Sequence, residues 1–371
     1  MNNKKVAIIG GGLSGLYAAY LLEKHGITDY VLLEARTQLG GRINSVAVDP
    51  NSNIDTIDLG PTWFWPDFQR QLDHLITELN LTRFTQYDIG NMLIERSQHE
   101  APIATKGFMA YPESVRLSGG MMALINKLKS HLKNQHIMLG KVVRKIQNLD
   151  GDITIHYQES QDKNTTKTDS VTVQHVLLAL PPRVIENTIE FTPSLPTVLT
   201  NQWRNTATWM AAHAKYVAVY DKPFWRDDGL SGSAQSRLGP MVEIHDASMP
   251  NGSAALFGFL GVPATVRQQV THDELKSHCL NQLTRLFGEQ ATNPKLTVLK
   301  DWAQDQYTAT QLDFNNINEH GRAPETTANS GSWAGKIIGV GSEWSAQFPG
   351  YVAGAIEAAS EGVKAYIKQS S

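Results

Sequence analysis

The chain has 371 residues, of which 41% are hydrophobic and 19% are charged, a composition typical of a folded protein with room for two domains. Its formal net charge of −3 at pH 7 is close to neutral, which excludes the strongly basic surface that binds nucleic acid or an acidic membrane. The single cysteine, Cys279, excludes an internal disulfide and a cysteine-ligated metal cluster, and we predict no metal site.

The N-terminal residues and the cysteine content favour a cytoplasmic protein. The first predicted strand follows directly after residues 1–5, without an apolar segment and cleavage site before it. No apolar run approaches the roughly 18 residues that a membrane-spanning helix needs. We therefore expect no membrane association, and we expect Cys279 to be a small buried hydrophobic residue in a reducing compartment.

The N-terminal unit is predicted as strand, glycine turn, helix and strand. Residues 6–9 are a short β-branched run typical of a buried parallel strand. The glycine-rich residues 10–15 (GGGLSG) follow at once, residues 13–25 keep helical spacing of apolar side chains, and residues 30–33 form the next strand. The unit closes on Glu34.

Each part of this unit has a physical role in binding a dinucleotide. Gly10 allows the tight turn, Gly12 allows the backbone to approach a pyrophosphate, and Gly15 allows the helix to pack close to the sheet. The free N–H groups at the helix N-terminus favour the phosphates, and Glu34 is placed to accept a ribose hydroxyl. Because an acid here disfavours a 2′-phosphate, we expect FAD or NAD rather than NADP.

Two further turns follow before residue 66. Residues 39–42 place two glycines beside Arg42, which either contacts a phosphate or the polar edge of a flavin or is a solvated surface charge. Residues 54–60 are predicted as a strand that leads into residues 58–66 (DLGPTWFWP), a turn too rich in aromatic residues for a simple surface loop. A flat ligand is expected to lie against it.

The rest of the chain supplies more elements of both kinds. The predicted elements are a helix over 121–132, a hairpin tip over 158–170, a strand over 176–180, an alternating strand over 214–220, a strand over 336–340 and a final helix that opens at 349–355.

Taken together, the motifs resemble those of the FAD-dependent amine oxidases, the monoamine and polyamine oxidase family. The motifs that carry the resemblance are Glu34-Ala35-Arg36, Gly40-Gly41-Arg42, Asp58-Leu59-Gly60, Ser118-Gly119-Gly120, Ala179-Leu180-Pro181-Pro182, Pro223-Phe224-Trp225-Arg226 and Gly341-Ser342-Glu343-Trp344. They touch both ends and the middle of the chain.

The resemblance implies an α/β fold with two interleaved domains. The first is a discontinuous, Rossmann-like FAD-binding domain of parallel strands and helices over residues 1–83, 114–204 and 305–371. The second is an α+β substrate-binding domain with a mixed sheet over residues 84–113 and 205–304.

The resemblance also implies the residues of the site. In the family, the strand that matches residues 141–146 pairs with adenine. The family lysine that matches Lys215 holds a water at flavin N5, and the family residue that matches Tyr351 is the second tyrosine of an aromatic cage. The implied cofactor-binding residues are Gly10, Gly12, Leu13, Ser14, Gly15, Glu34, Ala35, Arg36, Gly41, Arg42, Gly60, Pro61, Thr62, Trp63, Val142, Val143, Ala179, Gly341, Ser342, Glu343, Tyr351, Val352 and Ala355. The implied substrate pocket contains Trp63, Phe64, Leu312, Trp344 and Phe348.

The implied reaction is oxidation of an amine C–N bond to an imine, which is hydrolysed to an aldehyde or ketone, while O₂ reoxidises the flavin and yields H₂O₂. An alkylamine has a pKa of about 10.4, so the site must favour the rare neutral form, and burial between aromatic faces does so. For the aromatic residues of the pocket, core packing remains the alternative, and for Lys215 the alternative is a strand lysine that faces solvent. Whether hydrogen leaves as hydride or by a polar-nucleophilic route stays open.

Three features depart from the family pattern. Where monoamine oxidases carry a cysteine for covalent flavin attachment followed by the first cage tyrosine, this chain has Gln311 and Leu312, so we expect non-covalent FAD. Pro61 stands where the family usually has a second glycine. Only about thirty residues separate Thr85 from Arg116, so much of the usual helical lid is absent.

Several alternatives remain at this stage. A related flavin desaturase or dehydrogenase, of the protoporphyrinogen-oxidase or carotenoid-desaturase kind, would pass electrons to an acceptor other than oxygen. A flavoprotein that binds without turnover is a third hypothesis. The identity of the amine and the oligomeric state are not predicted, although Glu243 and Asp246 are candidates for the rim of the pocket.

Overall fold

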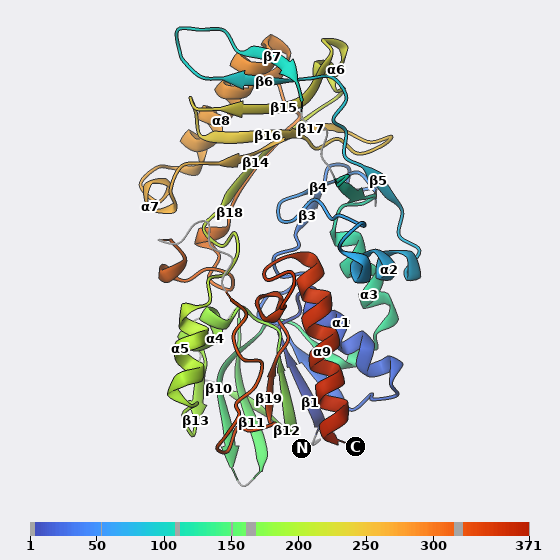
Figure 1. Cartoon of the computed structure of the whole chain (residues 1–371), viewed down its shortest axis with the longest axis vertical. Coiled ribbons are helices and arrows are strands. Elements are labelled where there is room, and N and C mark those ends of the chain that lie inside the picture. The colour runs from blue at the N-terminus through green and yellow to red at the C-terminus, as the bar shows by residue number, and fades with distance from the viewer. Residues whose placement is uncertain are drawn as a thin grey trace. The chain divides into compact units, whose positions relative to one another are not determined.

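The chain divides into two compact units in a computed structural model, which describes residues 4–52, 54–107, 112–149, 151–160, 168–314 and 322–370. Unit 1 comprises Met1–Arg42, Leu124–Met210 and Gln306–Ser371, and unit 2 comprises Ile43–Ala123 and Ala211–Asp305. Each unit is therefore assembled from separate pieces of the chain. Figure 1 shows the elements of both units.

Unit 1 is built on one sheet in the order β13-β10-β11-β12-β1-β2-β9, with β19 paired to β12. Parallel pairing joins β1 to β2 and β12, β12 to β19, β2 to β9 and β10 to β13, whereas β11 is antiparallel to both of its neighbours. The strands are β1 (Lys4–Ile9), β2 (Tyr30–Leu33), β9 (Ile137–Met138), β10 (Lys141–Leu149), β11 (Asp152–Glu159), β12 (Asp169–Leu178), β13 (Glu190–Thr192) and β19 (Ile337–Gly339).

The helices of unit 1 cover this sheet. They are α1 (Leu13–Lys24), α3 (Met122–His131, which begins at the end of a unit 2 piece), α4 (Pro182–Thr188), α5 (Thr197–Asn205) and α9 (Val352–Ser370), with 3₁₀ helices η1 (Asn134–His136), η4 (Gln311–Phe314) and η5 (Ser342–Trp344). Helices α1 and α9 pack side by side (Figure 1).

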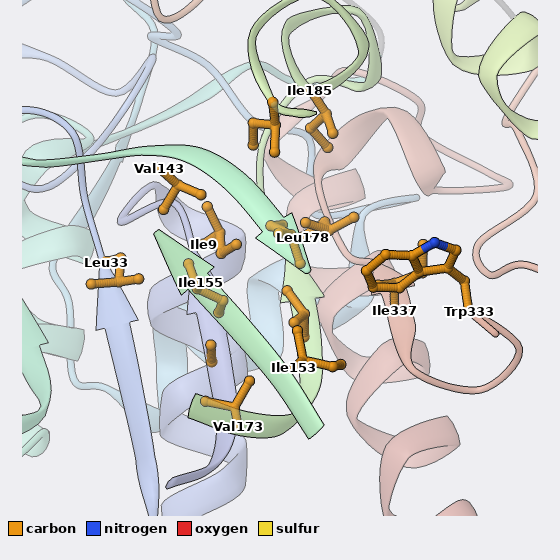
Figure 2. Packing of buried hydrophobic residues seen from close by; sticks show 14 of the residues in the cluster. Ile9, Leu33, Val143, Ile153, Ile155, Val173, Leu178, Ile185, Trp333 and Ile337 are labelled. Carbon is orange, nitrogen blue, oxygen red and sulfur yellow. The ribbon is translucent and has the colours of Figure 1, made fainter. Parts of the chain in front are cut away.

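The core of unit 1 lies between the sheet and α4, α5 and the segment around Trp333 (Figure 2). Ile153, Ile155 and Leu178 are fully buried there. Burial of each such side chain contributes about 1.5–3 kcal/mol. Strand β1 is buried along Val6–Ile9, as its apolar run predicted.

Unit 2 is built on a mixed sheet in the order β18-β14-β17-β16-β15-β6-β7, in which only the pairing of β15 with β6 is parallel among the strands described. Its strands are β6 (Asn91–Glu95), β7 (Ile103–Lys106), β14 (Ala214–Tyr220), β15 (Leu230–Ser236), β16 (Met241–Asp246), β17 (Ala254–Leu260) and β18 (Leu296–Asp301). The antiparallel pairs β3 (Ser45–Ala47) with β4 (Thr56–Asp58) and β5 (Arg83–Thr85) with β8 (Val115–Leu117) complete the strands of this unit.

Both faces of the unit 2 sheet are covered. The helix α8 (His272–Phe287) packs on one face, where Cys279 is fully buried as expected, and a Thr271–Glu274 capping box starts this helix. Residues of the β3–β4 segment, including Ile57 and Leu59, pack on the other face. The remaining helices are α2 (Arg70–Glu78), α6 (Phe224–Asp227), α7 (Ala264–Arg267), η2 (Glu289–Thr292) and η3 (Trp302–Gln304).

The α/β class and the second, mixed sheet confirm the predicted fold class. Residues 43–83 and 114–123 pack within unit 2 because β3, β4, β5 and β8 belong to it; the assignment of these residues to an FAD-binding domain stays a prediction. The hairpin expected at 158–170 joins β11 to β12, and its residues 161–167 lie outside the described part of the chain. Among the described ranges, no helix is both long and apolar enough to cross a membrane.

Candidate active site

The glycine turn after β1 has the geometry that each of its glycines permits. Gly10 has φ of 107°, a value that L side chains rarely adopt. A Cβ on Gly15 would lie 1.9 Å from the carbonyl oxygen of Gly10, so α1 packs closely only because that side chain is absent. A Cβ on Gly12, in contrast, would meet no atom closer than 3.8 Å, which leaves open space beside its backbone.

The N-terminus of α1 fits a phosphate group. Its N-cap residue, Gly12, makes no side-chain capping bond, and no acidic side chain lies in the first helical turn. A twelve-residue helix that begins at such a turn presents N–H groups and the positive end of its dipole. The open space at Gly12 and this uncapped end would leave room and N–H donors for a pyrophosphate.

Glu34 lies at the end of β2 and is 3% exposed. Its Oε2 accepts a hydrogen bond of 2.6 Å from the backbone N–H of Gly11, and its Oε1 accepts one of 2.8 Å from that of Arg36. A Cβ on Gly11 would lie 2.6 Å from Cδ2 of Leu39. A side chain at Gly11 would therefore clash, so this middle glycine of the turn is required as well. The sequence shows it as part of a run of three glycines, but the dinucleotide-binding pattern assigns no role to that position.

Arg42 is held in an ion-pair network rather than free in solvent. Its Nη1 donates to Oε1 of Glu343 at 2.6 Å, and its Nη2 donates to Oε2 of Glu343 at 3.0 Å and to Oγ of Ser342 at 2.9 Å. Only 2% of the Glu343 side chain is exposed. A bidentate pair of this kind fixes both side chains, so Arg42 and the adjacent residues Ser342 and Glu343, all predicted to bind the cofactor, come together in unit 1.

Two other predicted cofactor residues of unit 1, Gly41 and Ala179, lie next to the glycine turn. Gly41 has φ of 61°, and a Cβ there would lie 3.2 Å from Cα of Gly12. The backbone N–H of Ala179 donates to the carbonyl of Ile9 at 2.8 Å, next to the turn. The remaining members are Leu13, Ser14 and Gly15 in α1, Ala35 and Arg36 after β2, Val142 and Val143 on β10, Gly341 before η5, and Tyr351, Val352 and Ala355 at the start of α9.

Of three residues predicted for the substrate pocket, two are buried in the interior and one is exposed. Trp344 is 4% exposed and packs edge-to-face on Trp203 in the core of unit 1. Phe64 is fully buried in unit 2, where its backbone pairs with that of Val115. Leu312 is 48% exposed on η4. For Trp344 and Phe64, the alternative interpretation as core residues agrees with their burial.

In unit 2, Lys215 lies on an inner strand of the sheet and is 2% exposed, so it does not face solvent. Its Nζ donates a hydrogen bond of 2.6 Å to Oγ1 of Thr62 and one of 3.3 Å to the carbonyl of Gly60. The same nitrogen lies 3.9 Å from the centroid of the Phe257 ring. The lysine thus meets the turn that carries Gly60, Pro61 and Thr62.

Trp63 extends this cluster. Its indole packs against His245, with centroids 4.9 Å apart, and against Phe257 at 5.4 Å. Its Nε1 donates to Oε1 of Gln86 at 2.8 Å. The aromatic turn and the sheet face that carries Lys215 therefore form one apolar surface with a single buried amine within it.

Burial lowers the pKa of Lys215 from 10.5 to about 7. Asp58 opposes that shift by favouring the charged form, and Arg116 adds to it. Burial in turn raises the pKa of Asp58, whose Oδ1 accepts hydrogen bonds from Oγ of Ser45 at 2.5 Å and from the backbone of Met121 at 2.9 Å. An amine whose pKa lies near 7 exchanges a proton readily at physiological pH.

Sequence reasoning missed the roles of Asp58 and Arg116. Asp58 lies in a motif that was recognised, yet nothing local shows that it faces Lys215. Arg116 is 1% exposed, and its Nη1 and Nη2 donate to the carbonyls of Ser248 and Ala247. No local signal distinguishes it from a surface arginine.

The acids considered for the pocket rim have other partners. Asp246 is fully buried, and its Oδ2 accepts hydrogen bonds from Nε1 of Trp225 and from the guanidinium of Arg226. It is therefore not a rim residue, because its carboxylate is buried inside unit 2 and is already hydrogen-bonded to these two side chains. Oε1 of Glu243 lies 2.7 Å from Nε2 of His245.

Comparison with known proteins relates the whole chain to one family. A family model described as flavin containing amine oxidoreductase matches residues 95–364, and one described as NAD(P)-binding Rossmann-like domain matches residues 8–79. The chain is 23% identical over 463 residues to a probable flavin-containing monoamine oxidase A of Dictyostelium discoideum, with 95% of each protein covered. It is 24% identical over 450 residues to the flavin-containing amine oxidase B of Sus scrofa, with 95% of this chain and 84% of that protein covered.

Solved structures share the fold. A double mutant of a putrescine oxidase superposes with a TM-score of 0.78 at 19% identity, and a cyclohexylamine oxidase from Brevibacterium oxydans IH-35A superposes with a TM-score of 0.79 at 18% identity. Both matches cover 99% of this chain and 99% of the other.

Proposed function

Because this chain belongs to the flavin-containing amine oxidoreductase family, we propose that it oxidises the C–N bond of a small-molecule amine with non-covalently bound FAD and with O₂ as the electron acceptor. For a primary amine, one amine, one O₂ and one water give an aldehyde or ketone, ammonia and H₂O₂. The bound flavin supplies the two-electron acceptor that no protein side chain provides.

The buried Lys215 is the observation that carries this proposal. An isolated lysine inside an apolar sheet is costly unless it has a function or a partner, and here its Nζ bonds to Thr62 and Gly60 and has a pKa near 7. Such a group can hold and return a proton at Nζ during oxygen reduction or imine hydrolysis. Asp58 and Arg116 act on it through their charges.

The amine is proposed to react in its neutral form. Aromatic faces and a dry environment disfavour the ammonium ion, and we propose Tyr351 as one such face. No dedicated base is required, because the environment itself shifts the equilibrium of protonation.

FAD is the flavin that the glycine turn supports. We propose that the uncapped N-terminus of α1 binds the pyrophosphate and that Glu34 binds the adenosine ribose, with Arg42 and Glu343 as a fixed pair beside the cofactor. Cys279 is the single cysteine of the sequence, and it is fully buried on the inner face of α8. Burial raises the pKa of its thiol to about 12, which supports non-covalent attachment.

The substrate class remains broad within this proposal. The structural relatives include a putrescine oxidase and a cyclohexylamine oxidase, and we propose a small aliphatic, cyclic or aromatic amine. The near-neutral net charge is consistent with a cytoplasmic enzyme that binds neither nucleic acid nor membrane.

The decisive experiment is anaerobic titration of the purified yellow protein with a panel of amines, followed by admission of oxygen. We expect bleaching of the flavin absorbance by at least one amine, and then return of the colour with one H₂O₂ for each flavin. Bleaching without peroxide would favour the desaturase or dehydrogenase with another acceptor. A flavin that no amine bleaches would contradict amine oxidation altogether.

A further inference from the structure

Trp209 lies in the segment between α5 and β14, a position that the sequence did not single out. Its indole stacks beside the phenol ring of Tyr351, with ring centroids 6.3 Å apart and planes inclined by 28°. Both residues belong to unit 1 and are partly exposed. Offset-stacked aromatic pairs of this geometry attract each other beyond the effect of their buried area.

The residues next to the two rings, Gly350 before Tyr351 and Met210 after Trp209, both have an unusual backbone conformation. Gly350 has φ of 83°, and a Cβ there would lie 2.3 Å from Cβ of Trp209. Met210 has φ of 58°, an unusual value for a side chain other than glycine, asparagine or aspartate. Such strained residues persist where the surrounding structure determines them, and they cluster at functional sites.

A buried ion pair anchors the residue before Trp209. The carboxylate of Asp313 accepts hydrogen bonds from Nη1 of Arg183 at 2.6 Å and from the backbone N–H of Thr208 at 3.1 Å. The side chains of Arg183 and Asp313 are 5% and 2% exposed. The segment that presents the indole is therefore fixed by contacts on both of its sides.

The Tyr351 turn is connected to the predicted cofactor residues. The backbone N–H of Gly350 donates to the carbonyl of Ser342 at 3.1 Å, and Oγ of Ser342 accepts from Arg42. The ring pair thus lies at the end of a continuous series of contacts that starts at the Arg42–Glu343 ion pair.

From this arrangement we infer that Trp209 is a positioning and specificity residue of the amine site. Its indole holds the Tyr351 ring in one orientation and widens the aromatic surface beside it, so amines with a flat carbon ring are favoured over linear alkylamines. This inference rests on the proposed function. A ring that is already ordered loses less conformational entropy when a substrate binds.

The test compares Trp209→Leu, Trp209→Phe and the wild-type holoenzyme with benzylamine and butylamine as substrates. We expect Trp209→Leu to lower kcat/KM for benzylamine by about 3- to 10-fold and to change that for butylamine less, whereas Trp209→Phe keeps most of the preference. A matched control is Tyr20→Leu, because Tyr20 stacks on Tyr17 within α1, with ring centroids 6.2 Å apart and planes inclined by 24°, and has no place in the proposed site. The control should leave the ratio of the two substrates unchanged.

A second measurement does not depend on turnover. Benzamide is flat and neutral and carries no oxidisable amine, and its Kd can be measured by calorimetry. We expect Trp209→Leu to raise this Kd by about 3- to 10-fold and Tyr351→Leu to raise it as well, with the double variant less than additive because the two rings act together.

The outcomes separate the two proposals. If no amine reduces the wild-type flavin, the proposed function fails. If wild-type protein oxidises amines but Trp209→Leu keeps both the benzylamine preference and the benzamide Kd, the inference about Trp209 is overturned. Equal losses for both amines together with a lower Tm would also overturn it, because they would show a purely structural role.

Discussion

The side-chain nitrogen of Lys215 donates a hydrogen bond of 2.6 Å to Oγ1 of Thr62, a residue 153 positions earlier in the chain. This bond joins the inner strand β14 to the turn that follows β4. Since Thr62 accepts this bond and the carbonyl of Gly60 accepts another, the lysine has a defined position inside unit 2 without an ion-pair partner within bonding distance among the described residues.

Replacement of Lys215 by methionine should slow flavin reoxidation or turnover strongly, by about 100-fold if Nζ moves a proton in the slow step. The protein should remain yellow, because the glycine turn of unit 1 is unchanged. Stopped-flow reoxidation of the reduced enzyme by O₂ measures the effect. Lys222→Met is the matched control, since Lys222 is 68% exposed. Oxidative kinetics like those of the wild type would remove Lys215 from the site.

Because the pKa of Lys215 is lower in the folded protein than in the unfolded chain, the free energy of unfolding should rise with pH. Its pKa is about 7 in the folded protein and near 10.5 when exposed, so between these values the unfolded chain binds more protons. Stability therefore rises with pH across this window. Asp58 and Arg116 are the charged groups that act on Lys215, and both are unchanged in Lys215→Met. Urea unfolding from pH 7 to 9 should show the wild type gaining stability relative to Lys215→Met, and a constant difference would contradict the shifted pKa.

Two glycines of the turn should respond differently to alanine. Gly15→Ala places a Cβ 1.9 Å from a backbone oxygen, so it should destabilise the flavin-stripped protein by about 1–3 kcal/mol. Gly12→Ala meets no atom closer than 3.8 Å and should leave that stability nearly unchanged, while it weakens FAD binding by obstructing the pyrophosphate. Thermal melting and FAD titration separate the two effects. Full FAD affinity in Gly12→Ala would place the pyrophosphate elsewhere.

The Arg267–Asp301 ion pair should show strong coupling, because each side chain is only 1% exposed. Arg267→Met leaves the Asp301 carboxylate buried without its partner and should cost about 3–5 kcal/mol of unfolding free energy. The double variant Arg267→Met with Asp301→Leu should cost less than the sum of the two single changes. Urea denaturation of the four proteins in this cycle measures the coupling, and simple additivity would argue against it.

Acid precipitation tests the mode of flavin attachment. Non-covalent FAD should appear in the supernatant when the protein is denatured by acid, because the buried Cys279 thiol is not available for a bond to the flavin. Absorbance of the two fractions at the flavin maximum measures the distribution. Yellow colour that stays in the protein pellet would show covalent attachment.

Local patterns predicted much of the fold. The strand, glycine turn, helix and strand at the N-terminus were found as β1, α1 and β2, with β2 at the predicted residues. Hydrophobic periodicity and glycine placement are properties of neighbouring residues, so a sequence shows them directly. The strand that carries Lys215 was predicted for the same reason, and it spans Ala214–Tyr220.

Which side chains meet was decided by the tertiary structure. The sequence determined by itself that a glycine turn, a strand lysine and an aromatic turn exist in this chain. The fold decided that Arg42 pairs with Glu343 over a separation of 301 residues, that Lys215 points into unit 2 rather than to solvent, and that Trp209 stacks on Tyr351. The physical reason is that a strand or a turn has no preference for one partner until distant segments pack, and burial then sets both the contacts and the pKa of each group.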